Sequence, residues 1–363
     1  MSDLHLSTIL EQFLPAYQQE YPLSFHAKRV CEHITQCRTG ALGSQLWQCN
    51  GCHFEKTVHC SCRDRHCPRC QGNRRQRWAE QQQHQLIPSR YFHVVFTLPH
   101  TLNGLAQTAS DAVYHSLFQA VWQTVSQFAA NRKRGGQAGM TAVLHTWGQS
   151  LTQHIHLHCL VPGGFLNQAQ CWHSVEKDYL FPLKALSKVF RAKMLACLRA
   201  QGLELHNAKT LMQQDWGVYA KRCLCRPEAV IEYLGRYTQK GMLSESRLVA
   251  VDTQHVTFRY KDYRDNQHKV MQLSGVEFIR RYVSHILPKG FMRIRHFGFL
   301  ANRCRAQKLA VIRKQAKITK HEERDDKLQS SEGSHPVGNW PCPQCHRGLL
   351  LPAANRPLSV PPS

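Results

Sequence analysis

The order of apolar and polar residues along the chain predicts both helices and strands. Residues 1–36 are predicted to form a helical lead-in, because Thr8 followed three residues later by Glu11 can cap a first turn. Strands are predicted where β-branched and aromatic residues cluster, at 91–98, 141–146, 154–161, 255–260 and 269–273. Helices are predicted at 110–130, 183–201, 227–240 and 301–319. These elements indicate a mixed α+β fold in which 141–146 and 154–161 form an antiparallel pair.

The stretch at 37–70 differs from the rest of the chain. It is rich in Cys, His, Gly and Arg and shows no apolar periodicity, so it lacks a hydrophobic core of its own and needs another source of stability. A polar helical stretch follows and is stopped by Pro88. The sequence therefore predicts four regions: the lead-in at 1–36, a small metal-stabilised domain with a connecting helix at 37–87, a larger α+β domain at 88–319, and a flexible tail at 320–363.

The charge of the chain narrows the choice of partners. Lys and Arg number 47 against 24 Asp and Glu, which gives a formal net charge of +23 at pH 7. A soluble chain this basic is usually held near a polyanion, so nucleic acid is the first candidate partner. No stretch approaches the roughly 18 apolar residues that a membrane span needs, and the N-terminus lacks the pattern of a signal peptide. We expect a cytoplasmic, nucleoid-associated protein with no membrane partner.

The 16 cysteines point to metal rather than to disulfides, since no export signal is present and eight of them crowd residues 31–70. Cys49-x2-Cys52 and Cys67-x2-Cys70 are separated by 14 residues, a spacing typical of one tetrahedral zinc site with four thiolate ligands. Four thiolates leave no open coordination position. The zinc is therefore predicted to be structural.

Further candidate ligands leave the number of zinc ions open, between one and three. Cys37, Cys62 and His66 are also within reach of the CxxC pairs and could form a second site or replace one ligand. Cys342 and Cys345 form a lone CxxC in the predicted tail, half a zinc site that either has no partner or joins ligands such as His335. Arginines beside the first cysteines are predicted to face phosphates, although a solvated basic surface has the same composition. They are Arg63, Arg65, Arg69, Arg74, Arg75 and Arg77.

A histidine pattern marks the strand predicted at 154–161. Residues two apart on a strand share a face, so His154, His156 and His158 line one side while the apolar residues between them face the core. Imidazole is the commonest metal-ligand side chain, and a His-hydrophobic-His pair with a third ligand leaves coordination positions open for a substrate. We interpret the three histidines as a candidate catalytic metal site. A polar sheet face with three satisfied histidines is the alternative.

Two tyrosines lie four residues apart on the helix predicted at 227–240. Tyr233 and Tyr237 would share one helical face, one turn from each other. By itself such a pair more often packs in a core. Beside an open metal site, a phenol can attack a phosphodiester polarised by the cation and give a phosphotyrosine ester that conserves the energy of the broken bond. We interpret both tyrosines as candidate nucleophiles for two successive strand transfers.

Several ordered stretches closely resemble the two-tyrosine, rolling-circle transposases of the insertion sequence 91 family, which belong to the His-hydrophobic-His (HUH) endonuclease group. The stretches are SCRDRHCPRC at 61–70, YFHVVFTLP at 91–99, VLHTWGQ at 143–149, HIHLHCLVPGG at 154–164, YLGRYT at 233–238 and LPKGFMRIRHFGFLAN at 287–302. Together they cover both the cysteine segment and the α+β domain. The resemblance therefore extends over most of the chain.

The resemblance implies an N-terminal zinc-binding DNA-recognition domain and, at 88–319, a catalytic domain with a palm-like antiparallel sheet flanked by helices. The family's metal-binding pair falls on His156 and His158, with His154 as our choice of third ligand, and its nucleophiles fall on Tyr233 and Tyr237. The implied cofactors are structural Zn²⁺ and catalytic Mg²⁺ or Mn²⁺. The implied activity is nicking and transfer of single-stranded DNA, at transposon ends and target DNA, through 5′-phosphotyrosine intermediates.

This sequence departs from the commoner family pattern at Ile155, where proline is frequent, and at Gln239-Lys240, where a His-Arg pair is frequent. Neither departure removes a proposed catalytic group, but an accessory role for that histidine is in doubt. The main alternative function is a non-enzymatic, zinc-dependent DNA-binding protein derived from a decayed transposase. A metal nuclease that uses water is another. The order in which the tyrosines attack and the oligomeric state stay open.

Overall fold

The computed structural model describes residues 4–70, 86–132, 135–175, 180–222, 241–315 and 340–353. Its helices are α1 (Leu6–Glu20), α2 (Phe25–Thr35), α4 (Asn103–Thr108), α5 (Ser110–Ala130), α6 (Leu183–Ala200), α7 (Ala208–Gln213), α9 (Gly275–Val283) and α10 (Arg305–Gln315). Its strands are β1 (Ser44–Cys49), β2 (Glu55–His59), β3 (Tyr91–Thr97), β4 (Gly139–Trp147), β5 (Gln153–Pro162), β6 (Gly164–Leu166), β7 (Trp172–Ser174), β8 (Val218–Arg222), β9 (Leu248–Val251), β10 (His255–Asp262), β11 (Gln267–Ser274), β12 (Ile294–Gly298), β13 (Trp340–Pro341) and β14 (Leu349–Pro352).

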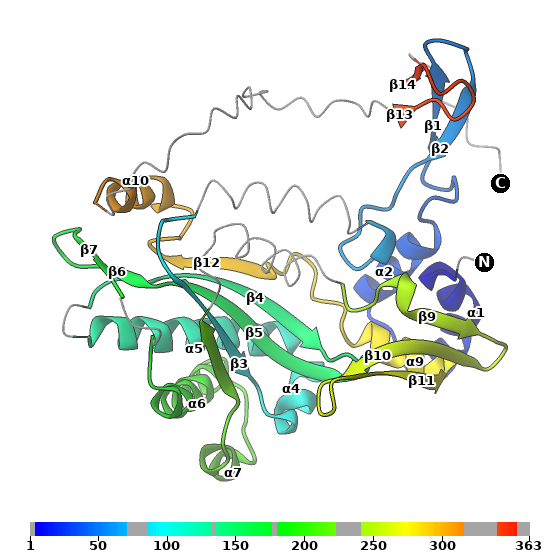
Figure 1. The fold of residues 1–363 in the computed structure, drawn as a ribbon. Coiled ribbons are helices and arrows are strands. Elements are labelled where there is room, and N and C mark those ends of the chain that lie inside the picture. The colour runs from blue at the N-terminus through cyan, green and yellow to red at the C-terminus, as the bar shows by residue number, and fades with distance from the viewer. Residues whose placement is uncertain are drawn as a thin grey trace.

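Five strands form a central antiparallel sheet in the order β12-β4-β5-β3-β8 (Figure 1). The middle strand, β5, pairs with β4 on one side and with β3 on the other. The antiparallel pairing predicted for 141–146 and 154–161 is confirmed by this register. Together with the helices, the sheet confirms the α+β class and the antiparallel, helix-flanked architecture.

The principal hydrophobic core lies between one face of this sheet and helices α5 and α6 (Figure 1). Alternate residues of β5, among them Ile155 and Leu157, point into this core. Phe190 of α6 packs edge-on against Phe96 of β3, with ring centroids 5.0 Å apart. Because strand side chains alternate, His156 of β5 faces the other side of the sheet, away from these helices.

A second core joins the N-terminal helices to a later part of the chain. Helices α1 and α2 pack with α9 and with the three-stranded sheet β11-β10-β9. The predicted lead-in is thus two helices, separated by residues 21–24, which include Pro22. The expected cap at Thr8 is not found. In the first turn of α1, the Leu6 N–H instead donates to the carboxylate of Glu245, 239 residues later in the sequence, at 3.0 Å.

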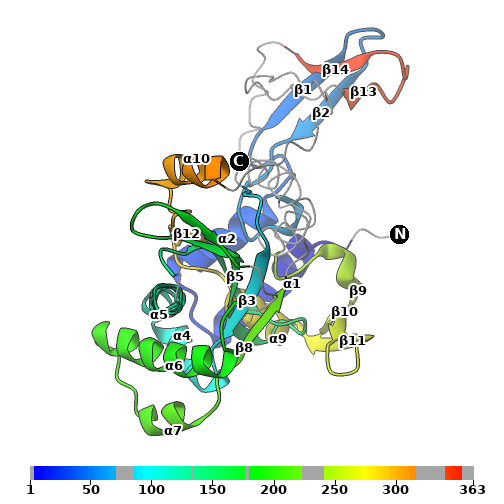
Figure 2. The ribbon, with the colours of Figure 1, turned by 60° about the vertical axis from the view of Figure 1, so that its left-hand side comes forward.

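A small four-stranded sheet, ordered β13-β14-β1-β2, projects from the rest of the molecule (Figure 1 and Figure 2). The β1–β2 hairpin forms one half of it, and β14 pairs with β1 so that Leu350 lies opposite Cys49. The prediction of a flexible tail with a lone CxxC over 320–363 therefore does not hold for 340–352. Strand pairing ties that segment to the N-terminal part of the chain.

Candidate functional site

Three histidines on adjacent strands meet on the sheet face opposite α5 and α6. His156 and His158 lie on β5, and His145 lies on β4 directly opposite His156. Their ligand nitrogens all lie within 4.8 Å of one another. The ring centroid of His158 is 4.5 Å from that of His145 and 4.7 Å from that of His156. Three imidazoles at this spacing could share one metal ion and leave further coordination positions open.

The third member of this group is His145, and not His154 as predicted. A strand rises about 3.3 Å per residue, so His154 and His158 are separated by about 13 Å along β5 and are poorly placed to share one ion. A residue directly opposite on a neighbouring strand is only about 5 Å away, and this is the position of His145. The His154 ring lies between those of His156 and His100, with centroids 4.8 Å and 5.7 Å away, and is not part of the three-histidine group.

Hydrogen bonds at Nδ1 orient the two β5 histidines. His156 Nδ1 donates to the His154 carbonyl at 2.8 Å, so Nε2 is the atom that carries the lone pair for a metal. His158 Nδ1 lies 2.9 Å from Nε2 of His93 on β3, and these two rings stack with centroids 5.1 Å apart. Partners of this kind fix the tautomer and ring orientation of metal-ligating histidines. Sequence reasoning missed His93 because it lies on a different strand.

Burial keeps these imidazoles neutral. Burial, followed by the charge of His154, lowers the pKa of His156 to about 4. Burial, followed by the charges of His145 and His156, lowers the pKa of His158 well below its usual value. Only a neutral imidazole offers a lone pair to a metal. Both side chains are therefore competent ligands at neutral pH without first losing a proton.

Trp147 and Arg293 extend the site beyond His145. The Trp147 indole stacks on the His145 ring with centroids 4.8 Å apart, and the Arg293 guanidinium lies 5.5 Å from the centroid of the Trp147 ring. Burial lowers the pKa of Arg293 to about 10, which leaves the guanidinium charged at neutral pH. A partly buried cation beside the histidines favours an anionic ligand such as a phosphate.

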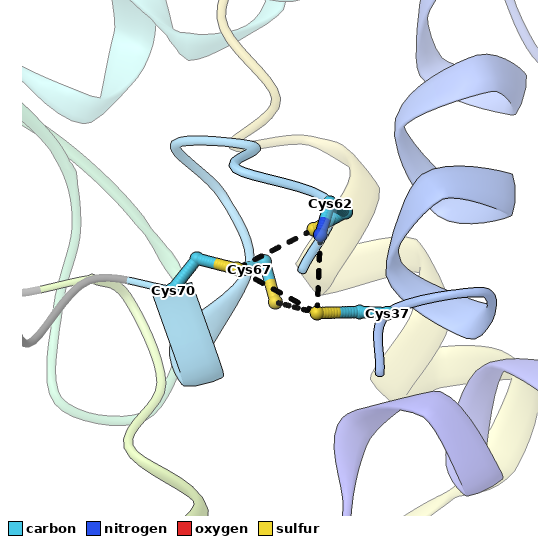
Figure 3. A group of neighbouring side chains, drawn as sticks. All are labelled: Cys37, Cys62, Cys67 and Cys70. Carbon is cyan, nitrogen blue, oxygen red and sulfur yellow. Dashed lines mark hydrogen bonds between the residues drawn. The ribbon is translucent and has the colours of Figure 1, made fainter. Parts of the chain in front are cut away.

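Four cysteines at the base of the β1–β2 hairpin form a compact group, Cys37, Cys62, Cys67 and Cys70 (Figure 3). The Cys70 sulfur lies 3.6 Å from those of Cys37 and Cys62, and the Cys37 sulfur lies 3.7 Å from that of Cys67. Sulfurs about 2.3 Å from a tetrahedral zinc ion are about 3.8 Å from one another, so this group fits zinc. Hydrogen bonds with Cys62 and Cys70, together with burial, raise the pKa of Cys67. Metal binding at this group therefore has to release a proton from Cys67.

The two CxxC pairs predicted to share one zinc lie in different groups. Cys67 and Cys70 belong to the group at the base of the hairpin, whereas Cys49 and Cys52 lie at its tip and group with cysteines of the C-terminal segment. Five strand residues span about 17 Å, so β1 and β2 hold the tip well away from the base. The 14-residue spacer contains β2, and this strand carries the chain away from the first CxxC.

The loop that carries Cys62, Cys67 and Cys70 is hydrogen-bonded to α9 and to the chain that follows it. The Tyr282 hydroxyl donates to the carbonyl of His66 at 3.1 Å, and the Leu287 N–H donates to His66 Nε2 at 3.2 Å. His66 is therefore a docking residue and not a member of the cysteine group. Arg65 reinforces this contact, because its guanidinium donates to the Pro288 carbonyl at 2.9 Å.

Two of the arginines predicted to face phosphates form hydrogen bonds with backbone carbonyls. Arg65 donates to backbone carbonyls after α9, and Arg69 donates to the carbonyl of Cys37 at 3.3 Å. Both therefore support the fold of the cysteine loop. The other predicted phosphate contacts beyond residue 70 lie outside the described residues; they are Arg74, Arg75 and Arg77.

Comparison with known proteins now assigns both parts of the chain. Residues 9–98, which include the first cysteine group, match a family described as "Transposase zinc-binding domain", and residues 139–308 match one described as "Putative transposase". "Putative transposase y4qJ" of Sinorhizobium fredii is 38% identical, over 95% of this chain and 94% of that protein. "Transposase for insertion sequence element IS801" of Pseudomonas savastanoi pv. phaseolicola is 29% identical, over 76% of this chain and 70% of that protein. The chain belongs to the insertion sequence 91 family of transposases.

Solved structures similar to this transposase include the conjugative relaxase TrwC in complex with oriT DNA. One metal-bound form has a TM-score of 0.28 and 12% identity, over 62% of this chain and 72% of the relaxase chain. Another form has a TM-score of 0.29 and 12% identity, over 80% of this chain and 95% of the relaxase chain.

The predicted nucleophiles of the transposase, Tyr233 and Tyr237, lie outside the described residues, as does the helix predicted at 227–240. The described chain reaches Arg222 at the end of β8, which pairs with β3 in the histidine-bearing sheet, and resumes at Gly241. Among the described helices of the transposase, none combines the length and the apolar character needed to cross a membrane.

Proposed function

We propose that this transposase nicks and transfers single-stranded DNA at the ends of its element, by a rolling-circle route through 5′-phosphotyrosine intermediates. The observation that carries the proposal is the group of three imidazoles, His145, His156 and His158, on adjacent strands of an antiparallel sheet. In this proposal the histidines hold a divalent cation, and Tyr233 and Tyr237 are the nucleophiles. Target DNA receives the transferred strand.

The donor set supports a catalytic rather than a structural ion. Three nitrogen ligands leave positions for substrate oxygens, in contrast to the closed thiolate group at the hairpin base. A bound Mg²⁺ or Mn²⁺ would polarise the scissile phosphate and stabilise charge on the leaving oxygen. Of these two ions, Mg²⁺ is the more restricted to oxygen ligands, so an all-imidazole set favours Mn²⁺ over Mg²⁺.

The chain's own residues supply the remaining chemistry. The phenol oxygen of one tyrosine forms a bond to phosphorus while the bond from phosphorus to the 3′ oxygen breaks, and the phenol proton passes to that oxygen, directly or through water. The products are a 5′-phosphotyrosine ester and a free 3′ hydroxyl. The ester conserves the energy of the phosphodiester, so a second DNA hydroxyl or the second tyrosine can take the strand without a nucleotide cofactor.

The surrounding charge suits this substrate. The net charge of +23 attracts a polyanionic strand, and the Arg293 guanidinium beside Trp147 places a cation near the histidines. The His145 ring stacks on the Trp147 indole. Trp147 therefore orients this histidine ligand rather than stacking on a DNA base. Arg293 thus supplies attraction for phosphate, and its neighbour Trp147 orients the metal ligand His145.

The test is incubation of the full chain with single-stranded element-end DNA and Mn²⁺, followed by denaturing electrophoresis. We expect a protein–DNA adduct that withstands denaturant and is lost in a Tyr233→Phe, Tyr237→Phe double variant. Tyr219→Phe is the matched control, because Tyr219 is an exposed tyrosine on β8 of the same sheet and should leave the adduct unchanged.

Two other outcomes would contradict this proposal, and each would assign a different function. Cleavage that persists without an adduct in the double variant would assign a metal nuclease that uses water. Tight binding of the DNA with neither adduct nor cleavage in the parent chain would assign a non-enzymatic, zinc-dependent DNA-binding protein.

A further inference from the structure

We propose that Cys49, Cys52, Cys342 and Cys345 bind a second zinc ion, which ties the C-terminal segment to the tip of the β1–β2 hairpin. This site is separate from the first cysteine group and from the histidines, and it does not depend on strand transfer. Its ligands come from two ends of the chain, nearly 300 residues apart.

The sulfur geometry fits a tetrahedral ion. The Cys49 and Cys345 sulfurs are 3.7 Å apart, and the Cys52 and Cys342 sulfurs are 3.6 Å apart. All four lie within 4.8 Å of one another. These separations are far longer than a disulfide bond of about 2.05 Å and close to the edge of about 3.8 Å for a four-thiolate zinc site.

The two CxxC turns have the same backbone conformation. The residue after the second cysteine is in the left-handed region in both, with φ of 58° at His53 and 54° at His346. In both turns this residue's N–H donates back to the carbonyl of the first cysteine, at 3.2 Å for His53 and 3.0 Å for His346. Left-handed backbone is uncommon for a residue with a side chain, so its occurrence at equivalent positions indicates one shared turn type.

Backbone amides point at the sulfurs in both turns. The Cys49 sulfur accepts from Gly51 N–H at 3.3 Å, and the Cys345 sulfur accepts from Gly348 N–H at 3.3 Å. Amide donors of this kind stabilise the thiolate form, which is the form that ligates metal. Gly348 also leaves room for the opposite turn, since a Cβ there would lie 2.5 Å from the Cys49 sulfur.

Protein contacts alone are too few to hold the small sheet together. Its hydrophobic cluster has four buried residues, two of them cysteines of the proposed site, and three partly buried ones: Trp47, Cys49, Cys342 and Leu350, with Phe54, Val58 and Cys345 packed against them. The exposed indole of Trp340 stacks on Trp47 with centroids 5.0 Å apart, which adds one aromatic contact. A core of this size is well below what an independent unit needs without a metal or a disulfide. A zinc ion supplies the missing stabilisation.

This zinc site affects the order in which parts of the chain fold. The hairpin tip is synthesised before the second CxxC turn, so its zinc shell is completed only when Cys345 has been made. The β14–β1 pairing and the zinc then close a loop that contains the whole histidine-bearing sheet. A truncated chain would keep the first cysteine group and the histidines and lack the second zinc.

The first test counts zinc in purified full-length chains by metal analysis. A His156→Ala, His158→Ala background removes any zinc taken up by the histidine group. We expect two zinc ions per chain in this background, and one after either Cys342→Ser with Cys345→Ser or Cys49→Ser with Cys52→Ser. Cys171→Ser with Cys304→Ser, outside both groups, should keep two. Retention of two zinc ions by the Cys342→Ser, Cys345→Ser chain would overturn the proposal, as would iron in place of zinc.

The second test needs no substitution and so does not depend on the folding of a variant. Cys52 and Cys171 are both exposed thiols. Brief alkylation of the native chain, read by peptide mass spectrometry, should modify Cys171 and spare Cys52, and chelation of zinc should expose Cys52 to the reagent. Equal modification of the two thiols in the zinc-loaded chain would refute the site.

Discussion

Nε2 of His93 lies 2.9 Å from Nδ1 of His158, although 65 residues separate them in the sequence. The contact exists because β3 pairs with β5 and both histidines face away from the helical core. The stacked rings, only 10° from parallel, leave His158 little freedom to rotate. His93 therefore acts as a positioning residue for a candidate metal ligand.

Replacing His93 by Ala is expected to weaken Mn²⁺ binding by about 10- to 100-fold, because loss of an outer partner frees the ligating ring. His93→Gln should recover part of the affinity, since a Gln side chain can still form a hydrogen bond with His158. Calorimetric titration of Mn²⁺ measures both. Unchanged affinity in His93→Ala, with an unchanged melting temperature, would remove this role.

His145 and His154 can be separated by parallel substitutions. His145→Ala is expected to abolish both Mn²⁺ binding and DNA nicking, because it removes one of three ligands. His154→Ala should retain both activities to within a few-fold, since the hydrogen bond that orients His156 goes to the backbone carbonyl of His154, which the substitution keeps. Metal titration and a nicking assay on the same preparations distinguish the two residues. Loss of both activities in His154→Ala, with both retained in His145→Ala, would instead support His154 as the third ligand, as strand alternation alone predicted.

Stability should fall as the pH falls, and His285 should be a main cause. Burial lowers its pKa to about 4, whereas an unfolded histidine titrates near 6.5. Between these values the unfolded chain binds more protons than the folded chain, so the contribution of His285 is complete above about pH 6.5 and is lost as the pH falls to about 4. The total effect of this group is on the order of 3 kcal/mol.

Urea unfolding at about pH 7 and about pH 5 measures this effect. A His285→Gln chain, which keeps a donor for the Leu151 carbonyl that His285 Nε2 contacts at 2.9 Å, should lose less stability over that interval than the parent. His206→Gln is the control, because the His206 side chain is 84% exposed. Equal losses in the parent and in His285→Gln would contradict the assignment.

The contact between α1 and α9 should be sensitive to one added methyl group. A Cβ at Gly275 would overlap the ring of Phe13, which is buried in the second core. Gly275→Ala is therefore expected to cost about 1–3 kcal/mol of unfolding free energy. Gly104→Ala, in helix α4 with nothing near the added Cβ, should be neutral or stabilising by up to about 1 kcal/mol. Chemical denaturation of the two chains side by side decides the matter, and equal stability would argue against close packing of α1 on α9.

Local pattern alone predicted several features of this protein. Helix α5 spans the expected residues 110–130, and α6 differs from its prediction by one residue. The placement of His156 and His158 on one sheet face also followed from the period of two, because strand alternation depends only on neighbouring residues. The CxxC turns were recognisable as metal motifs for the same reason, since two residues of spacing suffice to aim two sulfurs at one ion.

Tertiary structure decided which of these local units meet. His145 joins His156 through strand register, and Glu245 caps a helix that starts 239 residues earlier. Cys49 faces Cys345, although Cys67 is nearer in sequence, because β1 and β2 separate the hairpin tip from its base. Periodicity describes a segment and its own faces, whereas contacts between distant segments depend on register and packing across the whole chain. The sequence therefore determined the kinds of ligand present, and the fold determined how they are grouped.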